Sequence, residues 1–329
     1  MNHRRAFIAI AAAAAIGSSR QLRAQSPAKV ARIAWLSPGQ AAPGGGRHPW
    51  ENLTLERLRD LGWVDGRNLL VEFRYGGGRA EALPGLAAEV VALRPDLIIA
   101  PGTATTRAVR DATASIPIVM ASGGDPVGSG LVTSLARPGG NITGVSGQGH
   151  EIIPKALSLL QELVPQARRI DLLVNAANPG NAFFAKVFSD AARALGLDGR
   201  LLEVRSADEL EGAIAMTQAD ALLMLSDGLF YLNRQRIADA AIKRRLPLGD
   251  SANRDHIVAG NLISYAIKTD DVWLLAATYA DRILRGAKPA EMPIEQPSRY
   301  QLIINLKTAE AIGITVPQAL LLRADELVR

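Results

Sequence analysis

The sequence predicts an α/β protein with parallel sheets, built as two similar lobes whose loops face each other across a cleft. Short apolar runs alternate with longer amphipathic segments through most of the 329 residues. Several of these runs are apolar throughout, as a parallel strand covered by helices on both faces requires. The pattern is interrupted near residues 146–150 and then begins again. This alternation is typical of doubly wound α/β units.

The predicted strands are apolar runs, about five before the boundary and about five after it. The runs in order are 30–36, 69–75, 96–100, 117–121, 142–145, 170–175, 201–204, 220–225 and 302–305. Between them, residues 80–94 and 155–164 carry apolar side chains at i, i+3, i+4 and i+7, which predicts helices. A further helix is expected over 229–245, and another after Thr269, where Asp270 and Asp271 favour the helix dipole.

The first 24 residues read as a secretory signal peptide. A basic start, MNHRR, precedes the apolar stretch AFIAIAAAAAIG, and small and polar residues follow, with cleavage expected after Ala24. The alternative is a buried N-terminal helix, but four arginines flanking an alanine run fit export better. RRAFI partly matches the twin-arginine pattern, which leaves the export route open. Without cysteine there are no disulfides and no lipid anchor, so we expect a soluble exported protein.

The charge balance argues against a nucleic-acid partner. The formal net charge of +5 includes four arginines in residues 1–24, which contain no acidic residue. Without that segment, 33 basic residues face 32 acidic ones, a net charge of +1. A nearly neutral body offers no electrostatic footprint for nucleic acid.

Motifs for nucleotide binding or catalysis are missing. Neither G-x-G-x-x-G nor G-x-x-x-x-G-K-[ST] occurs, and there is no G-x-S-x-G elbow. Without cysteine, and with dispersed histidines, a zinc site is not expected. The sequence therefore predicts no catalytic residue, no metal, no cofactor and no enzymatic activity. The four histidines are His3, His48, His150 and His256.

Ligands of open α/β sheets bind beyond the carboxyl ends of the strands. The loops at those ends are polar or rich in small residues, and they come from both halves of the chain. They are residues 37–40, 101–106, 122–126, 175–180, 226–228 and 249–253.

Six stretches together resemble the periplasmic substrate-binding components of ATP-driven importers, in the family with tryptophan- and tyrosine-binding members. They are LRDLGWVDGRNLLVEFRY, DLIIAPGT, IPIVMASGGDPVGSGLVTSLARPGGNITGV, KALSLLQELVPQARRIDLLVNAANPG, ILRGAKPAEMPIEQP and LIINLKTAEAIGITVP. They run from about residue 30 to residue 328, which is nearly the whole chain after the signal peptide.

The resemblance implies two Rossmann-like lobes, as in type I periplasmic binding proteins, joined by three crossing segments. Residues 29–146 and about 266–290 would form the N-terminal lobe. Residues 147–265 and about 291–329 would form the C-terminal lobe. The first residues of the glycine-rich stretch 123–145 would then line the cleft, and its last residues would form a turn and a strand.

The expected ligand is a small zwitterion or carboxylate. Thr103 and Thr105 open a helix whose N-terminus attracts a carboxylate, although Thr103 is alternatively its N-cap. Asp125 and Asp227 could each accept from a ligand amine, or serve only as a turn residue and a helix cap. Phe230 and Tyr265 are candidates for stacking, with core positions as the alternative. The full predicted set is Ser37, Gly102, Thr103, Ala104, Thr105, Ser122, Asp125, Asn175, Asn178, Asp227, Phe230, Ser251 and Tyr265.

The expected function is solute capture for an ABC importer. A small organic ligand would close the lobes. The resemblance implies an amino acid-like, aromatic ligand, and an unrelated organic acid is the alternative. The closed form would deliver the ligand to an inner-membrane permease from the periplasm, and a monomer suits this mechanism. The alternatives are a sensor that presents its ligand to a membrane receptor and an exported enzyme on the same scaffold. A neighbouring permease gene, a receptor gene or product formation would discriminate among them.

Overall fold

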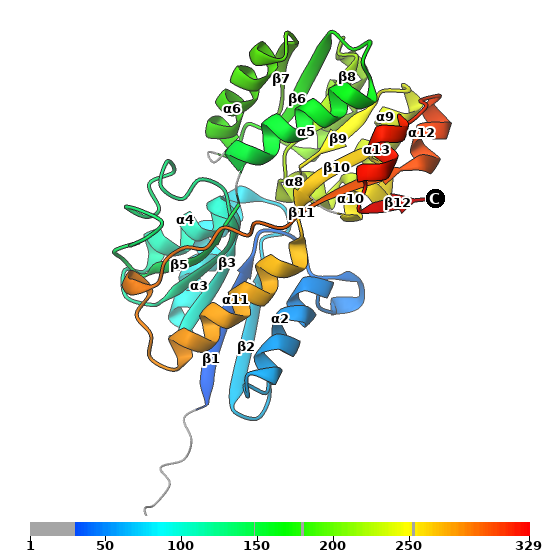
Figure 1. Ribbon diagram of the computed structural model, residues 1–329. Helices are drawn as coiled ribbons and strands as arrows, with labels where there is room; N and C mark the ends of the chain where they lie inside the picture. The colour runs from blue at the N-terminus through cyan, green and yellow to red at the C-terminus, as the bar shows by residue number, and fades with distance from the viewer. Residues whose placement is uncertain (1–29, 148, 179–180, 252–253) are drawn as a thin grey trace, which may run out of the picture. The chain divides into compact units, whose positions relative to one another are not determined.

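The computed structural model describes residues 30–147, 149–178, 181–251 and 254–329. The predicted signal peptide and its cleavage site lie outside the described residues. So do the last two residues of each of the loops 175–180 and 249–253. Residues Ala31–Arg329 form one compact unit, which contains two β-sheets covered by helices (Figure 1).

The first sheet has strand order β2-β1-β3-β4-β5, and all neighbouring strands are parallel. Its side chains alternate between two helical layers. Trp35 and Ile99 pack towards α2 and α11 on one face, whereas Ile98 and Met120 pack towards α3 and α4 on the other. The strands are β1 (Ala31–Ser37), β2 (Leu69–Tyr75), β3 (Leu97–Pro101), β4 (Ile118–Gly123) and β5 (Ile142–Ser146), and the helices are α2 (Pro49–Asp60), α3 (Leu83–Ala92), α4 (Gly102–Ala112) and α11 (Thr269–Leu284).

The second sheet has strand order β12-β11-β10-β9-β8-β6-β7 and is parallel except between β10 and β11. Its strands are β6 (Arg169–Asn175), β7 (Asp198–Val204), β8 (Ala221–Met224), β9 (Leu248–Asp250), β10 (Ile263–Ile267), β11 (Tyr300–Asn305) and β12 (Glu326–Val328). Its helices are α5 (Gly149–Leu163), α6 (Asn181–Ala194), α7 (Leu210–Met216), α8 (Gly228–Leu232), α9 (Arg234–Lys243), α10 (Arg254–Ala259), α12 (Leu306–Ile312) and α13 (Gln318–Arg323). Short 3₁₀ turns lie at Pro43–Gly45, Ala80–Ala82, Ala207–Glu209 and Pro289–Glu291.

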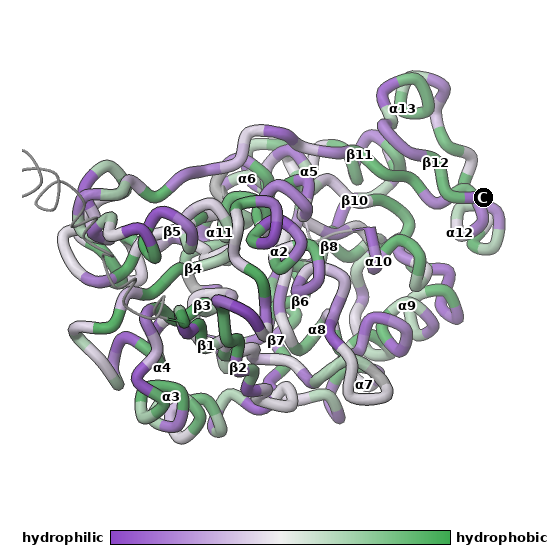
Figure 2. The backbone as a smooth tube through the Cα atoms, turned by 90° about the horizontal axis from the view of Figure 1, so that it is seen from below, coloured by the Kyte–Doolittle hydropathy of each residue, from purple (hydrophilic) through white to green (hydrophobic). Residues whose placement is uncertain are grey.

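The predicted α/β class with two lobes of parallel strands is confirmed. Each of the nine predicted runs contains a strand, and β1 and β3 are drawn as hydrophobic stretches in Figure 2. The second sheet has seven strands rather than about five, because β9, β10 and β12 were not predicted. The predicted helix 229–245 is divided into α8 and α9 at Asn233, whose φ of −108° and ψ of 16° are not helical.

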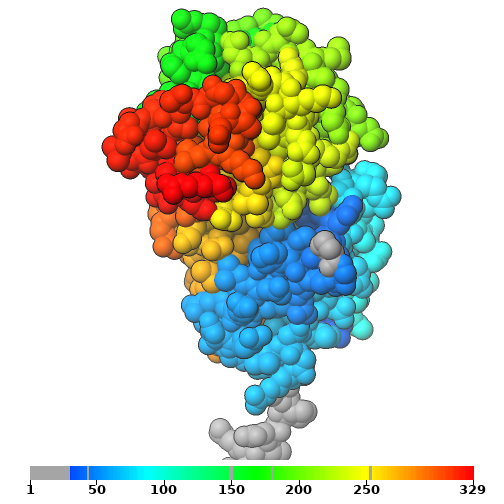
Figure 3. All heavy atoms as spheres, turned by 90° about the vertical axis from the view of Figure 1, so that its right-hand side faces the viewer, coloured from blue at the N-terminus to red at the C-terminus, as the bar shows by residue number. Residues whose placement is uncertain are grey.

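Helix α11 follows a strand of the second sheet but packs against the first. Its side chains Val272, Trp273 and Ala276 join the core beneath Trp35. Figure 3 shows this yellow-orange segment beside the blue N-terminal residues, with the red C-terminal residues on the other lobe. The lobe boundaries given above remain a prediction. Ile294 donates its N–H to Leu135, and Glu295 pairs with Val145, so we propose that the last boundary follows Glu295 rather than residue 290.

Candidate functional site

A cavity of about 340 Å³ lies between the two sheets, at the carboxyl ends of their strands. From the first lobe, the loops after β1, β3 and β4 contribute to it. From the second lobe, the loops after β6, β8 and β9 do so. Ten of the thirteen predicted residues line it: Ser37, Gly102, Thr103, Ala104, Thr105, Ser122, Asn175, Asn178, Asp227 and Ser251. Their binding roles remain predictions.

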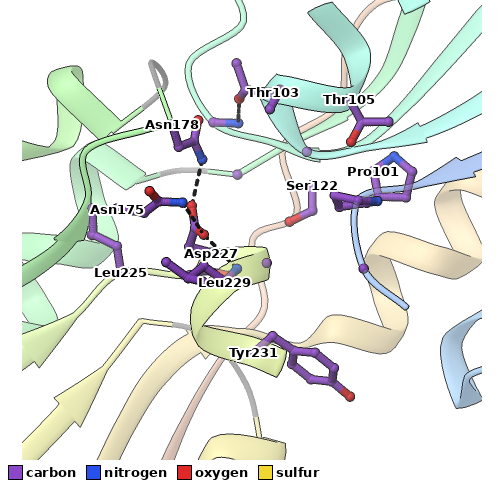
Figure 4. Close-up of a pocket in the computed structure, with 18 of the residues that line it drawn as sticks. Pro101, Thr103, Thr105, Ser122, Asn175, Asn178, Leu225, Asp227, Leu229 and Tyr231 are labelled. Carbon is purple, nitrogen blue, oxygen red and sulfur yellow. Dashed lines mark hydrogen bonds between the residues drawn. The ribbon is translucent and has the colours of Figure 1, made fainter. Parts of the chain in front are cut away.

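Asp227 provides the negative charge of the cavity and is held by several donors (Figure 4). Its Oδ1 accepts from the Leu229 N–H at 2.9 Å and from Asn175 Nδ2 at 3.0 Å. Its Oδ2 accepts from Asn178 Nδ2 at 2.8 Å. The side chain is 9% exposed. Asp227 is therefore the N-cap of α8, as the alternative interpretation expected. Asn181 Nδ2 is a further donor, 3.5 Å from Oδ2. These four donors occupy the roughly four acceptor positions of a carboxylate, so a ligand donor would replace the long Asn181 contact.

The N-terminus of α4 faces the cavity from the first lobe. Its N-cap is Pro101, and Thr103 Oγ1 instead accepts from the Gly124 N–H at 3.0 Å, so the N-cap alternative for Thr103 is wrong. Thr105 is fully buried, and its Oγ1 has no hydrogen-bond partner among the described residues. The first N–H groups of an α-helix lack intrahelical acceptors. The α4 N-terminus and the Thr105 hydroxyl can therefore bind an anion.

One wall of the cavity is aromatic. Trp50 at the start of α2 stacks on His48 with a ring-centroid distance of 4.2 Å, and it meets Tyr231 of α8 edge-on at 5.2 Å. Trp273 of α11 lies 6.2 Å from Trp50. His256 of α10 lies 5.9 Å from Tyr231. We refer to these five residues as the aromatic wall. Because two of them come from the second lobe, the wall spans both lobes.

Sequence reasoning missed the aromatic wall because its members lie on helices rather than at strand ends. No local pattern separates Trp50 or Trp273 from an ordinary core tryptophan, since only the packing of α2 against α11 brings them together. His256 was noted only as one of four dispersed histidines. A short turn, α8, brings Tyr231 next to it.

Three predicted residues lie outside the cavity. Asp125 Oδ1 accepts from the backbone N–H groups of Val127 and Gly128, so this carboxylate closes a turn. Phe230 is fully buried in the core between α9 and the second sheet, because α8 turns its side chain inward. The ring of Tyr265 stacks on Tyr300 at 5.4 Å, on the surface of β10 and β11.

Burial changes the titration of two groups in the aromatic wall. Desolvation, with a smaller contribution from the nearby Arg234 cation, lowers the pKa of His256 to about 3. Burial also raises the pKa of Tyr231, and the Asp255 carboxylate, which accepts from its hydroxyl at 2.9 Å, raises it as well. Both side chains are therefore neutral at neutral pH. No group of residues suited to a metal ion occurs in the described parts of the chain.

The fold and the site define a class of protein: a two-lobe α/β binding protein with a solute cavity between its sheets. The family model for ABC transporter substrate binding proteins matches residues 52–328. The chain therefore belongs to this family, and the resemblance seen in the sequence is confirmed. The family is defined by the binding of a transported solute, in agreement with the prediction that the chain is not an enzyme.

Individual proteins resemble this chain in sequence or in fold. A tyrosine-binding protein of Clostridioides difficile is 26% identical over 262 residues, covering 79% of this chain and 75% of its own. A solved Streptococcus pneumoniae ABC domain in complex with L-Trp has a TM-score of 0.81 and 25% identity, covering 91% of this chain and 99% of its own. A conserved domain protein of Vibrio cholerae has a TM-score of 0.84 at 24% identity, covering 91% and 100%.

No helix in the described residues is both long and apolar enough to span a membrane.

Proposed function

We propose that this chain is the extracytoplasmic solute-binding component of an ABC importer, and that its ligand is an amino acid with an aromatic side chain. The observation that carries the proposal is the pairing of two opposite binding groups across one cavity. The Asp227 carboxylate lies on one lobe, and the N-terminus of α4 with Thr105 lies on the other. An amino acid is a small molecule that carries both complementary charges.

The two charged ends of the ligand have distinct binding groups. Asp227 would accept hydrogen bonds from the ammonium group, because a charge-assisted bond to a buried carboxylate is stronger than a neutral one. Asn175 and Asn178 hold the Asp227 carboxylate in its orientation. The ligand carboxylate would bind the α4 N-terminus and the Thr105 hydroxyl, which has no partner among the described residues.

The aromatic wall supports the choice of side chain. Trp50, Trp273 and Tyr231 offer flat apolar faces and edges to the cavity, against which an aromatic ring packs well. The names of two relatives point the same way, since one is a tyrosine-binding protein and one was solved with L-Trp.

Transport would follow from closure of the two lobes. A ligand that contacts both lobes stabilises their closed arrangement by its greater affinity for that state. The closed form would then dock on an inner-membrane permease. We place the protein in the periplasm as a monomer, on the basis of its family and the predicted signal peptide.

The proposed function is tested by identifying the ligand. Purified protein is denatured, and the released small molecules are identified by mass spectrometry. A thermal-shift panel of amino acids and aromatic acids follows. A ligand at 100 times its Kd should stabilise the fold by about 2.7 kcal/mol. A shift with an aromatic amino acid supports the proposal. A panel in which only an unrelated acid stabilises the protein would keep the transport function and reject the amino acid.

A further inference from the structure

His256 lines the cavity but has no role in the zwitterion site. Its side chain is 1% exposed, and neither ring nitrogen has a hydrogen-bond partner among the described residues. The oxygen Asp250 Oδ2 is 4.0 Å from Nδ1, which is too far for a hydrogen bond. Nearly all buried polar atoms in native proteins are hydrogen-bonded. An imidazole with two unpaired nitrogens beside a ligand cavity therefore requires an explanation.

The polar side-chain groups of two neighbours of His256, Asp250 and Tyr231, are engaged elsewhere. Asp250 accepts from Asn261 Nδ2 at 2.8 Å and from Ser264 Oγ at 2.7 Å. The Tyr231 hydroxyl donates to Asp255. Because burial lowers the pKa of His256 to about 3, the ring is neutral at neutral pH. It therefore offers one N–H donor and one acceptor nitrogen.

The position of His256 indicates which part of a ligand it would meet. Tyr231, whose ring lies 5.9 Å from His256, is four residues after Asp227, about one turn along α8. Figure 4 shows Asp227 among its asparagines and Tyr231 further along this helix, pointing away from them. His256 therefore belongs to the aromatic end of the cavity, whereas Asp227 belongs to the charged end.

We propose that His256 forms a hydrogen bond with a polar group at the far end of the ligand side chain. The site then selects aromatic amino acids with a ring hydroxyl or ring N–H over phenylalanine, which has neither. This inference rests on the proposed function. The selectivity follows because a ligand without that group leaves the buried imidazole unpaired.

The test compares three ligands on two variants. Calorimetric Kd values are measured for L-tyrosine, L-tryptophan and L-phenylalanine with wild-type protein, His256→Leu and His256→Gln. Wild type should bind tyrosine or tryptophan about tenfold or more tightly than phenylalanine. His256→Leu should lose most of this ratio with phenylalanine affinity nearly unchanged, and His256→Gln, which keeps a donor and an acceptor, should retain part of it. Ile257→Val, on the same helix, should alter packing and keep the ratio.

The outcomes separate this inference from the proposed function. Binding with the same ratio in wild type and His256→Leu would overturn the role of His256 and leave the proposed function standing. No binding of any of the three to wild type would overturn both. Ligand-free stability gives a second readout, because replacing an unpaired polar group by an apolar one is neutral or stabilising. If His256→Leu unfolds at lower denaturant than wild type without ligand and keeps the ratio, His256 is structural and the inference is wrong.

Discussion

At the scale of single residues, we propose that ligand binding depends on the negative charge of Asp227. Asp227→Asn keeps the shape of the side chain and remains a good N-cap for α8, but it removes the charge that would hold a ligand ammonium. We expect the protein to fold and to bind its amino acid about tenfold to a hundredfold more weakly, since a charged hydrogen bond contributes about 1.5–3 kcal/mol. Isothermal titration calorimetry measures this change.

Asp125→Asn is the matched control. The substitution makes the same change of charge. Asp125 also follows a strand, but its carboxylate closes a turn outside the cavity. Ligand affinity should stay within about twofold of wild type. Equal losses in the two variants would show that net charge rather than the site matters.

The hydroxyl of Thr105 is predicted to serve the ligand and not the fold. Thr105→Val removes a buried oxygen with no partner among the described residues, so it should leave stability unchanged or raise it while weakening ligand binding. Thr106→Val should instead destabilise the fold and leave ligand binding unchanged, because Thr106 Oγ1 donates to the carbonyls of Ala100 and Gly102. It should cost about 1 kcal/mol of stability. Urea unfolding and calorimetry of both variants check this, and weaker folding of Thr105→Val would contradict it.

His256 should make stability depend on pH. Its folded pKa of about 3 lies below the value of about 6.5 expected in the unfolded chain. Below pH 6.5 only the unfolded state takes the proton, so stability present above that pH is lost as pH falls towards 3. Between pH 7 and pH 5, the free energy of unfolding should fall by about 2 kcal/mol more in wild type than in His256→Leu. Urea unfolding at both pH values measures the difference, and equal losses would refute it.

Local sequence could find candidate residues but could not choose among them. Asp125 and Asp227 both follow buried strands, and only the tertiary fold shows that one faces the cavity and the other a turn. Phe230 and Tyr231 are adjacent, yet α8 buries the first and presents the second to the cavity. Which way a five-residue helix faces depends on its packing.

At the scale of elements, α8 of the second lobe packs against the first lobe. Leu232 packs onto the loop after β2, where a Cβ at Gly78 would lie 2.8 Å from its Cδ1, and Gly228 lies against Pro38 of the first lobe. The element that carries Asp227 and Tyr231 is therefore seated on the opposite lobe. We therefore expect ligand binding and lobe contact to be coupled through the same short helix.

Gly78→Ala tests this coupling. Gly78 has a φ of +77°, and alanine there adds both backbone strain and a clash with Leu232. Gly77→Ala is the control, with a φ of +67° and nothing within 4 Å of its Cβ. Both should lose about 1–2 kcal/mol of stability. Only Gly78→Ala should also weaken ligand binding, by about fivefold or ~1 kcal/mol in calorimetry. Equal affinities would contradict the coupling.

The elements that sequence reasoning predicted are the ones whose pattern is local. β3 and β4 are apolar on both faces because helices cover both sides of the first sheet. β9 is three residues long with a central glycine, and β12 is equally short. β10 pairs antiparallel with β11, and its small Ser264 lies between the larger Ile263 and Tyr265. These strands are stabilised by their neighbours in the sheet, so their own residues give little signal.

At the scale of the whole chain, three features combine: two sheets, a cavity between them, and a family that binds transported solutes. Sequence predicted the two lobes because the strand–helix alternation restarts after residue 150. It could not predict the aromatic wall, whose members lie far apart in the sequence, from His48 to Trp273. The proposed ligand selection would therefore be a property of the assembled lobes rather than of any motif.

The most direct test of the proposed amino acid site is calorimetric titration of ligand-free wild-type protein, prepared by unfolding and refolding, with L-tryptophan and L-tyrosine. We expect saturable binding of one ligand per chain. The affinity should fall about tenfold to a hundredfold in Asp227→Asn and stay near that of wild type in Asp125→Asn. Absence of binding to either amino acid, or binding that Asp227→Asn leaves unchanged, would contradict the claim that the cavity between the lobes is an amino acid site.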